Sequence, residues 1–123
     1  MDSKKWIGIG ALLGFLSVAL GAFGAHALKG ILSEKATGVF QTAVHYQMYH
    51  ALGLIVFGLW GAQYHDSYRS WPAWSFLAGV LLFCGSLYGL VFTGIRQFAW
   101  VTPIGGGLFL AGWIMFAFLA WRA

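Results

Sequence analysis

The chain has 123 residues, of which 60% are hydrophobic and only 8% are charged. Soluble domains carry about 25% charged residues, and a fold of this size has too little interior to hide so much apolar surface. The composition therefore excludes an ordinary soluble domain and predicts a single transmembrane domain over residues 1–123. Seven Lys and Arg against three Asp and Glu give a net charge of +4. These cations stand between apolar runs, so they indicate topology and headgroup contacts, and no nucleic-acid partner is expected.

Four stretches without Asp, Glu, Lys or Arg follow one another along the chain. Each exceeds the about 20 residues that a helix needs to cross a bilayer. Backbone groups find no partner in lipid, so each stretch is expected to be an α-helix. Short connections between them predict an up-down-up-down bundle of four transmembrane helices, which is an all-α integral membrane fold. The expected helices cover roughly residues 5–28, 34–62, 72–95 and 102–122.

Small residues recur on one face of the first and third helices, at alternating spacings of four and three. In lipid, helices associate by close packing, so such stripes mark helix–helix interfaces. The stripe of the first helix is Gly10, Gly14, Ser17, Gly21 and Gly24. That of the third helix is Ser75, Gly79, Ser86, Gly89 and Thr93, with Leu82 and Arg96 continuing the same spacing.

The helix borders carry signals of their own. Ser33 followed by Glu34 predicts an N-cap and an acidic first turn for the second helix. Pro72 and Pro103 fall near expected helix starts, where a missing N–H costs little. Tryptophans are expected to form an aromatic belt on side A, the membrane face that holds both termini: Trp6, Trp60, Trp71, Trp74 and Trp121. Trp100 marks the opposite face, side B.

Slightly more cations are expected on side A than on side B. Four of them are expected there, Lys4, Lys5, Arg69 and Arg122, against three on side B, Lys29, Lys35 and Arg96. Because cytoplasmic loops carry the excess of Lys and Arg, this division favours cytoplasmic termini.

Up-down threading brings polar residues from several helices to side B. Polar groups at membrane depth are costly, so they suggest either a ligand site or hydrogen bonds that hold the helices together, and we favour the second. The candidate ligand-binding residues are His26, Tyr46, Gln47, His50, Tyr88 and Arg96.

No catalytic or metal site is predicted, and no cofactor is assigned. A zinc hydrolase needs three ligands and a general base, whereas the only acid near the cluster is Glu34. His45 and His50 are five residues apart and diverge by about 140°, so they do not suit one metal. A quinone, a lipid headgroup, a metal such as copper, or haem between His26 and His50 remain as alternatives. The lone Cys84 is interpreted as a packing residue, since it has no second thiol.

Several motifs together resemble domain-of-unknown-function family 423. They are Gly21–Leu28 (GAFGAHAL), Thr42–Leu52 (TAVHYQMYHAL), Gly85–Leu90 (GSLYGL) with Thr93-Gly94, and Thr102–Gly107 (TPIGGG) with Gly112-Trp113. The resemblance implies a small four-helix protein of the bacterial inner membrane, with mitochondrial relatives and no settled activity. His45 departs from the family pattern, in which Arg is usual, and this argues against His45 as an essential ligand.

We therefore expect a non-catalytic membrane protein that acts through helix packing, as an oligomer or as an accessory of a larger membrane complex. A protein that binds a ligand at side B is the first alternative. A small channel or carrier is the second, although no ionisable residue is expected near the middle of the membrane and no ring of charges is evident.

Overall fold

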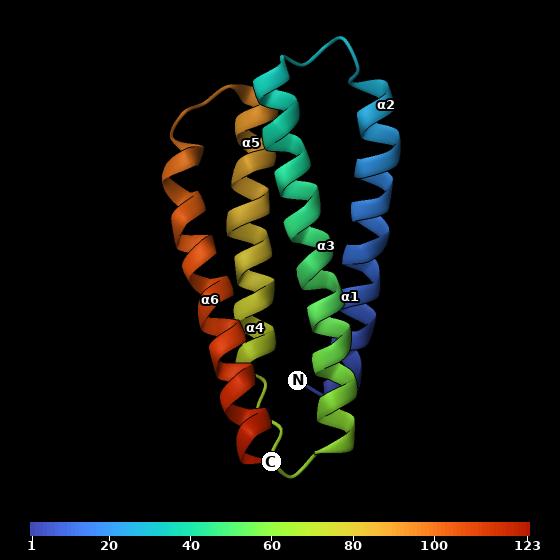
Figure 1. The fold of residues 1–123 in the computed structure, drawn as a ribbon, viewed down its shortest axis with the longest axis vertical. Coiled ribbons are helices and arrows are strands. Elements are labelled where there is room, and N and C mark those ends of the chain that lie inside the picture. Colours follow the sequence, from blue (N-terminus) through green and yellow to red (C-terminus); the bar gives the residue numbers. More distant parts are fainter.

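A computed structural model describes all 123 residues and contains helices without strands. The first two rods of the fold are joined by a short connection (Figure 1). The first, here called the α1–α2 rod, is a continuous helix with a π-helical segment: α1 (Ser3–Val18), η1 (Ala19–Gly24) and α2 (Ala25–Ala27). The second rod is α3 (Glu34–Gln63).

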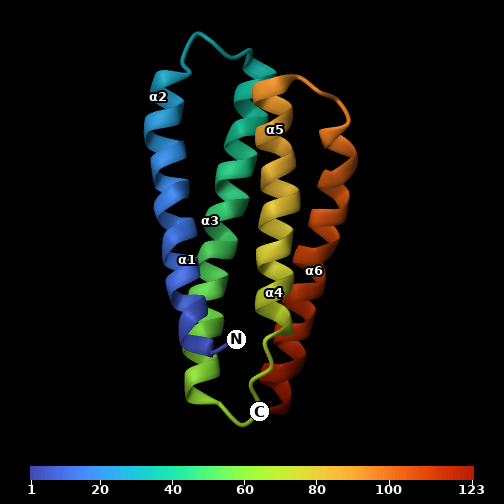
Figure 2. The same ribbon diagram turned by 180° about the vertical axis from the view of Figure 1, so that it is seen from behind.

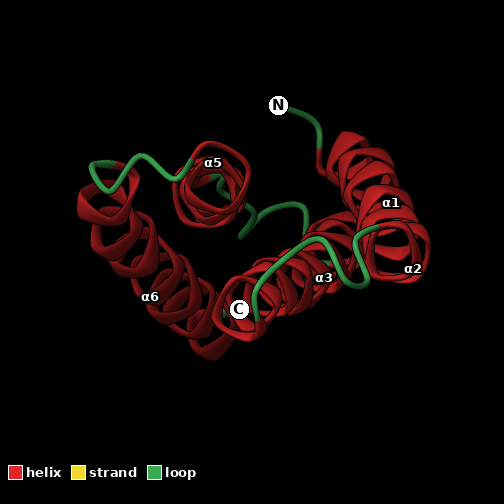
Figure 3. Ribbon diagram, turned by 90° about the horizontal axis from the view of Figure 1, so that it is seen from above, coloured by secondary structure: helices red, strands yellow, loops and turns green.

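The third rod also contains a π-helical segment. It consists of α4 (Trp71–Gly79), η2 (Val80–Cys84) and α5 (Gly85–Thr93), and is called the α4–α5 rod below. The fourth rod is α6 (Phe98–Arg122). The number of helices agrees with the sequence prediction. Seen from behind, the α1–α2 rod and α3 stand beside the α4–α5 rod and α6 (Figure 2), and from above α3 lies between the α1–α2 rod and the other two (Figure 3).

Local signals explain most of the helix ends. The Ser33 hydroxyl accepts a hydrogen bond from the Ala36 N–H at 3.1 Å, which is the predicted N-cap, with Glu34 in the first turn. Gly94 ends α5 with a φ of 72°, a left-handed conformation that glycine adopts without strain. The prediction was wrong for α6, which begins at Phe98 rather than residue 102 and so places Pro103 inside the helix.

The small-residue stripe of the α1–α2 rod lies against α3, and the two helices run antiparallel. Gly10 contacts the α3 backbone so closely that an added Cβ would lie 2.6 Å from the Ala51 carbonyl oxygen. Towards the other end of the rod, a Cβ at Gly24 would lie 2.9 Å from the Phe40 ring. Between these points the Ser17 hydroxyl donates to the Val44 carbonyl at 3.4 Å. The predicted role of this stripe as a helix–helix interface is confirmed.

The stripe of the α4–α5 rod packs in the same way against α6. The Ser75 hydroxyl donates to the Leu108 carbonyl at 2.6 Å. Further along the rod the hydroxyls of Ser86 and Thr102 are hydrogen-bonded to each other. A Cβ at Gly89 would lie 2.9 Å from the Phe98 ring. Most of each predicted stripe therefore lies between two helices that are neighbours in sequence, whereas Thr93 and Arg96 at the end of the second stripe are exposed.

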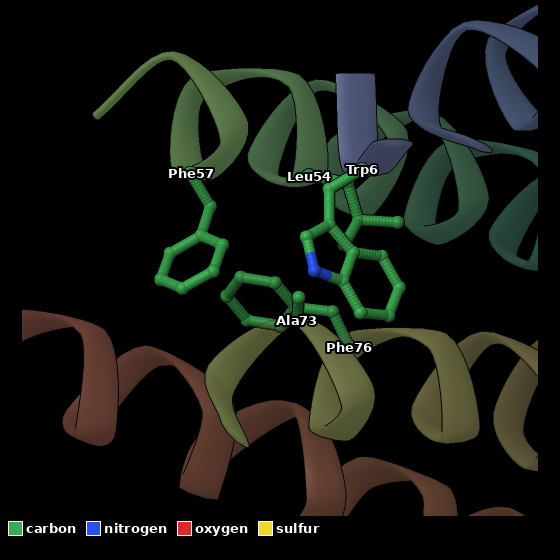
Figure 4. Packing of buried hydrophobic residues seen from close by; sticks show 5 residues of the cluster. All are labelled: Trp6, Leu54, Phe57, Ala73 and Phe76. Atoms are coloured by element: carbon green, nitrogen blue, oxygen red, sulfur yellow. The ribbon is translucent and has the colours of Figure 1, made fainter. Parts of the chain in front are cut away.

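An aromatic core joins the two helix pairs near side A (Figure 4). It is formed by five fully buried residues from three rods: Trp6, Leu54, Phe57, Ala73 and Phe76. Trp6 was expected in an interfacial belt, and this prediction was wrong because its indole is 0% exposed and its Nε1–H donates to the Tyr68 hydroxyl at 2.9 Å. Trp71 and Trp121 remain on the surface, 65% and 92% exposed.

Three rods are long and apolar enough to cross a membrane by length and composition: Ser3–Ala27, Trp71–Thr93 and Phe98–Arg122. α3 has 30 residues but is not among them. Its mean hydropathy is lowered by polar residues such as Gln41, His45, Gln47 and His50. α3 is therefore the most polar of the four rods, and it contacts both the α1–α2 rod and the α4–α5 rod.

Candidate functional site

Gln47 on α3 joins three rods through one side chain. Its amide Nε2 donates to the Leu13 carbonyl of α1 at 2.9 Å, and its Oε1 accepts from the Tyr88 hydroxyl of α5 at 2.7 Å. Gln47 is only 4% exposed. An amide offers both a donor and an acceptor, so this one residue satisfies a backbone carbonyl on one side and a phenol on the other.

His50, one turn further along α3, makes a second set of contacts. Its Nδ1 lies 2.7 Å from the Tyr46 carbonyl, and its Nε2 lies 3.0 Å from the Trp113 Nε1 of α6. A carbonyl only accepts and an indole N–H only donates, so Nδ1 carries the proton and Nε2 supplies the lone pair. The geometry thus fixes a neutral imidazole with both nitrogens occupied.

The imidazole of His50 is also enclosed by aromatic rings. Its ring stacks on Phe109 with centroids 3.5 Å apart and an interplanar angle of 9°. Phe76 meets it edge-on at 5.4 Å, and His50 is 3% exposed. Tyr46 stands one turn away with its ring 4.8 Å from Phe83, but 40% of it is exposed. Tyr46 thus contributes its backbone carbonyl to the site, while its hydroxyl makes no hydrogen bond within the molecule.

The depth of these residues differs from the sequence prediction. His50 stands 16 residues after Glu34 and 13 before Gln63. At about 1.5 Å per residue it lies near the middle of a helix about 45 Å long. Gln47 and His50 therefore lie near the middle of α3 and not at its side-B end, where they were predicted. We call Gln47, His50, Tyr88 and Trp113 the central polar cluster.

The other candidate residues are not part of the central polar cluster. His26 on α2 and Arg96 in the connection between α5 and α6 are both exposed, and neither side chain makes a hydrogen bond within the molecule. His45 is exposed as well, with its ring 6.4 Å from that of Tyr49. The structure thus brings Gln47 and Tyr88 into direct contact and places His50 and Tyr46 beside them, but leaves His26 and Arg96 apart.

The central polar cluster is poorly suited to hold a metal. No three His, Cys, Asp or Glu side chains gather where they could hold a metal ion. A haem iron bound through His50 would require the Nε2 lone pair that now accepts from Trp113. Imidazole ligation by His50 is therefore incompatible with the packing described here unless α6 moves.

Sequence reasoning missed two members of this arrangement. Trp113 was noted only as part of a motif, although a tryptophan in the middle of a span, away from the interfacial belts, is itself a sign of a buried N–H partner. The Leu13 carbonyl carries no sequence signal, because any residue has a backbone carbonyl. Only the pairing of α1 with α3 reveals it.

Comparison with known proteins places the chain in a family. A family model described as "Protein of unknown function (DUF423)" matches residues 20–106. The chain belongs to the DUF423 family. The family predicted from the sequence motifs is thereby confirmed, and the matched residues include Gln47, His50 and Tyr88.

Relatives of this DUF423 chain cover nearly its whole length. A UPF0382 membrane protein of Staphylococcus haemolyticus is 49% identical over 112 residues, which is 91% of each chain. One of Haemophilus influenzae is 42% identical over 120 residues, or 98% of this chain and 96% of the relative. YwdK of Bacillus subtilis is 43% identical over 113 residues, or 91% and 92%. No solved structure matches the chain. The names of these relatives support the membrane assignment and give no activity.

Proposed function

We propose that this chain is a non-catalytic, four-span protein of the bacterial inner membrane that acts through helix packing, as an oligomer or as an accessory of a larger membrane complex. Its four rods cross the bilayer up-down-up-down with both termini in the cytoplasm. The cations Lys4, Lys5, Arg69 and Arg122 support this orientation, because they outnumber the three at the other end.

The observation that carries the proposal is the closure of the central polar cluster. Every polar atom of Gln47 and His50 that points into the molecule has a partner on another helix or on the α3 backbone. No buried side-chain nitrogen or oxygen is left without a hydrogen bond. A catalytic or binding site needs polar groups free to meet a substrate, whereas these groups are used to join α3 to the other three rods.

The surface left for function is the outer, apolar face of the rods. On α6, Leu110 and Ile114 are 74% and 70% exposed, and Gly107 has open space where a Cβ would lie. A small residue next to large ones on the same helix face allows the backbone of another helix to approach closely. This face is therefore the contact surface that we propose for a second copy or a partner subunit.

Disulfide trapping in native membranes tests the proposal. In a Cys84→Ala background, Gly107→Cys should form a disulfide-linked species of twice the chain mass, or a stoichiometric adduct with one partner protein. The control is Gly85→Cys, also at a glycine with open space beside it but on α5. Native mass spectrometry of the gently extracted protein gives the number of chains independently. A Gly107→Cys variant that stays monomeric, together with a single-chain mass, would contradict the proposal.

The competing proposal is a ligand bound by the six residues predicted from the sequence, among which Tyr46, His26 and Arg96 keep polar groups free of intramolecular bonds. His50→Ala separates the two ideas. Under the packing proposal the variant loses stability without losing any bound species. A variant of unchanged stability that sheds a defined extra mass would favour the ligand instead.

A further inference from the structure

A groove at side B is separate from the central polar cluster. It has a volume of about 540 Å³, within the range of about 300–1,000 Å³ that is common for ligand pockets. It lies where the start of α3, the end of α5 and the start of α6 meet, and it is lined by ten residues: Ser33, Lys35, Ala36, Val39, Leu90, Val91, Gly94, Arg96, Ala99 and Trp100.

Both charged residues that line the groove are cations. Lys35 comes from the first turn of α3 and Arg96 from the connection that precedes α6, and neither has an ion pair or a side-chain hydrogen bond within the molecule. Glu34, the one acid at this end of the chain, is exposed and does not line the groove. The N-terminal end of α3 adds a partial positive charge from its unpaired N–H groups. The mouth of the groove thus favours an anion.

The remaining wall of the groove is apolar. Val39 on α3 faces Leu90 and Val91 on α5, and Trp100 stands at the rim with 73% of its surface exposed. Tryptophan at this level is typical of the boundary between headgroups and acyl chains. A free anion would leave this wall uncovered, so the groove matches a molecule that has both an anionic head and an apolar tail.

We propose that this groove binds an anionic phospholipid, with its phosphodiester between Lys35 and Arg96 and one acyl chain along Val39, Leu90 and Val91. Two cations in a groove that no acid lines favour a lipid with a net negative charge over a zwitterionic one. The inference requires only the membrane location and is independent of the proposed contact face on α6.

The groove-like pocket near the termini does not compete with this assignment. It has a volume of about 300 Å³ and includes Asp66 beside Arg69 and Arg122. The Arg69 guanidinium already donates to the carbonyls of Asp66 and Tyr68. Arg122 lies over the Phe118 ring at 5.2 Å. Both arginines of this pocket already contact groups within the molecule, and Asp66 is among its lining residues. Of these two pockets, the side-B groove is therefore the better match for an anionic headgroup.

Native mass spectrometry of the detergent-purified protein, titrated with dimyristoyl phosphatidylglycerol or dimyristoyl phosphatidylcholine, tests the proposal. The phosphatidylglycerol should bind at least tenfold more tightly. Lys35→Gln and Arg96→Gln should each weaken its binding about fivefold, as expected for one cation near a headgroup. Lys29→Gln is the matched control, since Lys29 is exposed at the same end but lies outside the groove.

Two further arms distinguish a lipid from a bare phosphate site. Dihexanoyl phosphatidylglycerol has the same headgroup with short chains and should bind more weakly than the dimyristoyl lipid, because it covers less of the apolar wall. Inorganic phosphate at millimolar concentration should not displace the bound lipid. Equal binding of the two dimyristoyl lipids, equal effects of Lys29→Gln and Arg96→Gln, or displacement by inorganic phosphate would each overturn the proposal. The lipid comparison on the unmodified chain keeps the test valid if a variant folds poorly.

Discussion

Removing the hydrogen bond between Gln47 and Tyr88 tests most directly whether the central polar cluster holds the rods together. Gln47→Leu keeps a similar side-chain volume but removes both bonds of the amide, to the Leu13 carbonyl and the Tyr88 hydroxyl. Hydrogen bonds between membrane helices contribute about 0.6 kcal/mol on average and up to about 1.7 kcal/mol. The variant should therefore lose about 1–3 kcal/mol of unfolding free energy.

The double variant separates this bond from general damage to the core. Tyr88→Phe alone should cost about 0.6–1.7 kcal/mol, because it leaves the Gln47 Oε1 without a partner. In the double variant, Gln47→Leu with Tyr88→Phe, neither the Gln47 Oε1 nor the Tyr88 hydroxyl is left without a partner, because both are absent. The combined loss should then be smaller than the sum of the single losses by about 0.6–1.7 kcal/mol.

The assay is reversible unfolding of the purified protein by increasing SDS in mixed micelles, followed by tryptophan fluorescence. Tyr49→Phe is the control, since Tyr49 is on the same helix, is 56% exposed and its hydroxyl makes no hydrogen bond within the molecule. It should leave the unfolding free energy unchanged. If the losses of the two single variants add to within about 0.3 kcal/mol, the residues are independent and the reasoning fails.

Three further predictions use the same unfolding assay. Gly10→Val should lower the free energy of unfolding by about 1–3 kcal/mol, because the added side chain forces α1 away from α3. Gly8→Val is the control and should change it little, because the space beside Gly8 is open. Equal losses in the two variants would contradict this packing. Trp113→Phe should cost about 1 kcal/mol, because the His50 Nε2 loses its donor, and an unchanged free energy would show that this bond does not contribute. Burial raises the pKa of Tyr68 above its ordinary value, so the unfolded chain ionises first and stability should fall as pH rises above 10. Tyr68→Phe should remove that added fall, and a pH profile identical to that of the unmodified chain would refute the assignment.

The sequence predicted the helices and the faces by which sequential helices pack. Spacings of three and four between Gly10, Gly14 and Ser17 put small residues on one face, and that face does meet α3. The composition could not show how deep a residue lies in a long helix. The charge-free run that begins at Ala36 is longer than a bilayer requires, so its position along the membrane normal was undetermined, and His50 was placed too near one end.

The site was predictable only in part, for a related reason. Gln47, His50 and Tyr88 were singled out because polar residues in apolar spans are costly. Their partners depend on which helices are neighbours and on the rotation of each about its axis. Trp6 illustrates the same limit, since a tryptophan in the first turn of a membrane helix fits a belt as well as a core. The structure places Trp6 in the core, where it is hydrogen-bonded to Tyr68, 62 residues away in the chain.

The polarity of α3 has a consequence for how the molecule assembles. In lipid, an isolated α3 would leave the Gln47 amide and one nitrogen of His50 without partners, at a cost of several kcal/mol. The partners are the Leu13 carbonyl on α1, the Tyr88 hydroxyl on α5 and the Trp113 indole on α6. Since these stand on rods both before and after α3 in the chain, Gln47 and His50 have all of their partners only when the four rods are packed together. The two π-helical segments, η1 and η2, lie in the α1–α2 rod and the α4–α5 rod, and both of these rods pack against α3. The most polar helix therefore makes the stability of the four rods interdependent, which accounts for placing costly side chains in the middle of so small a membrane protein.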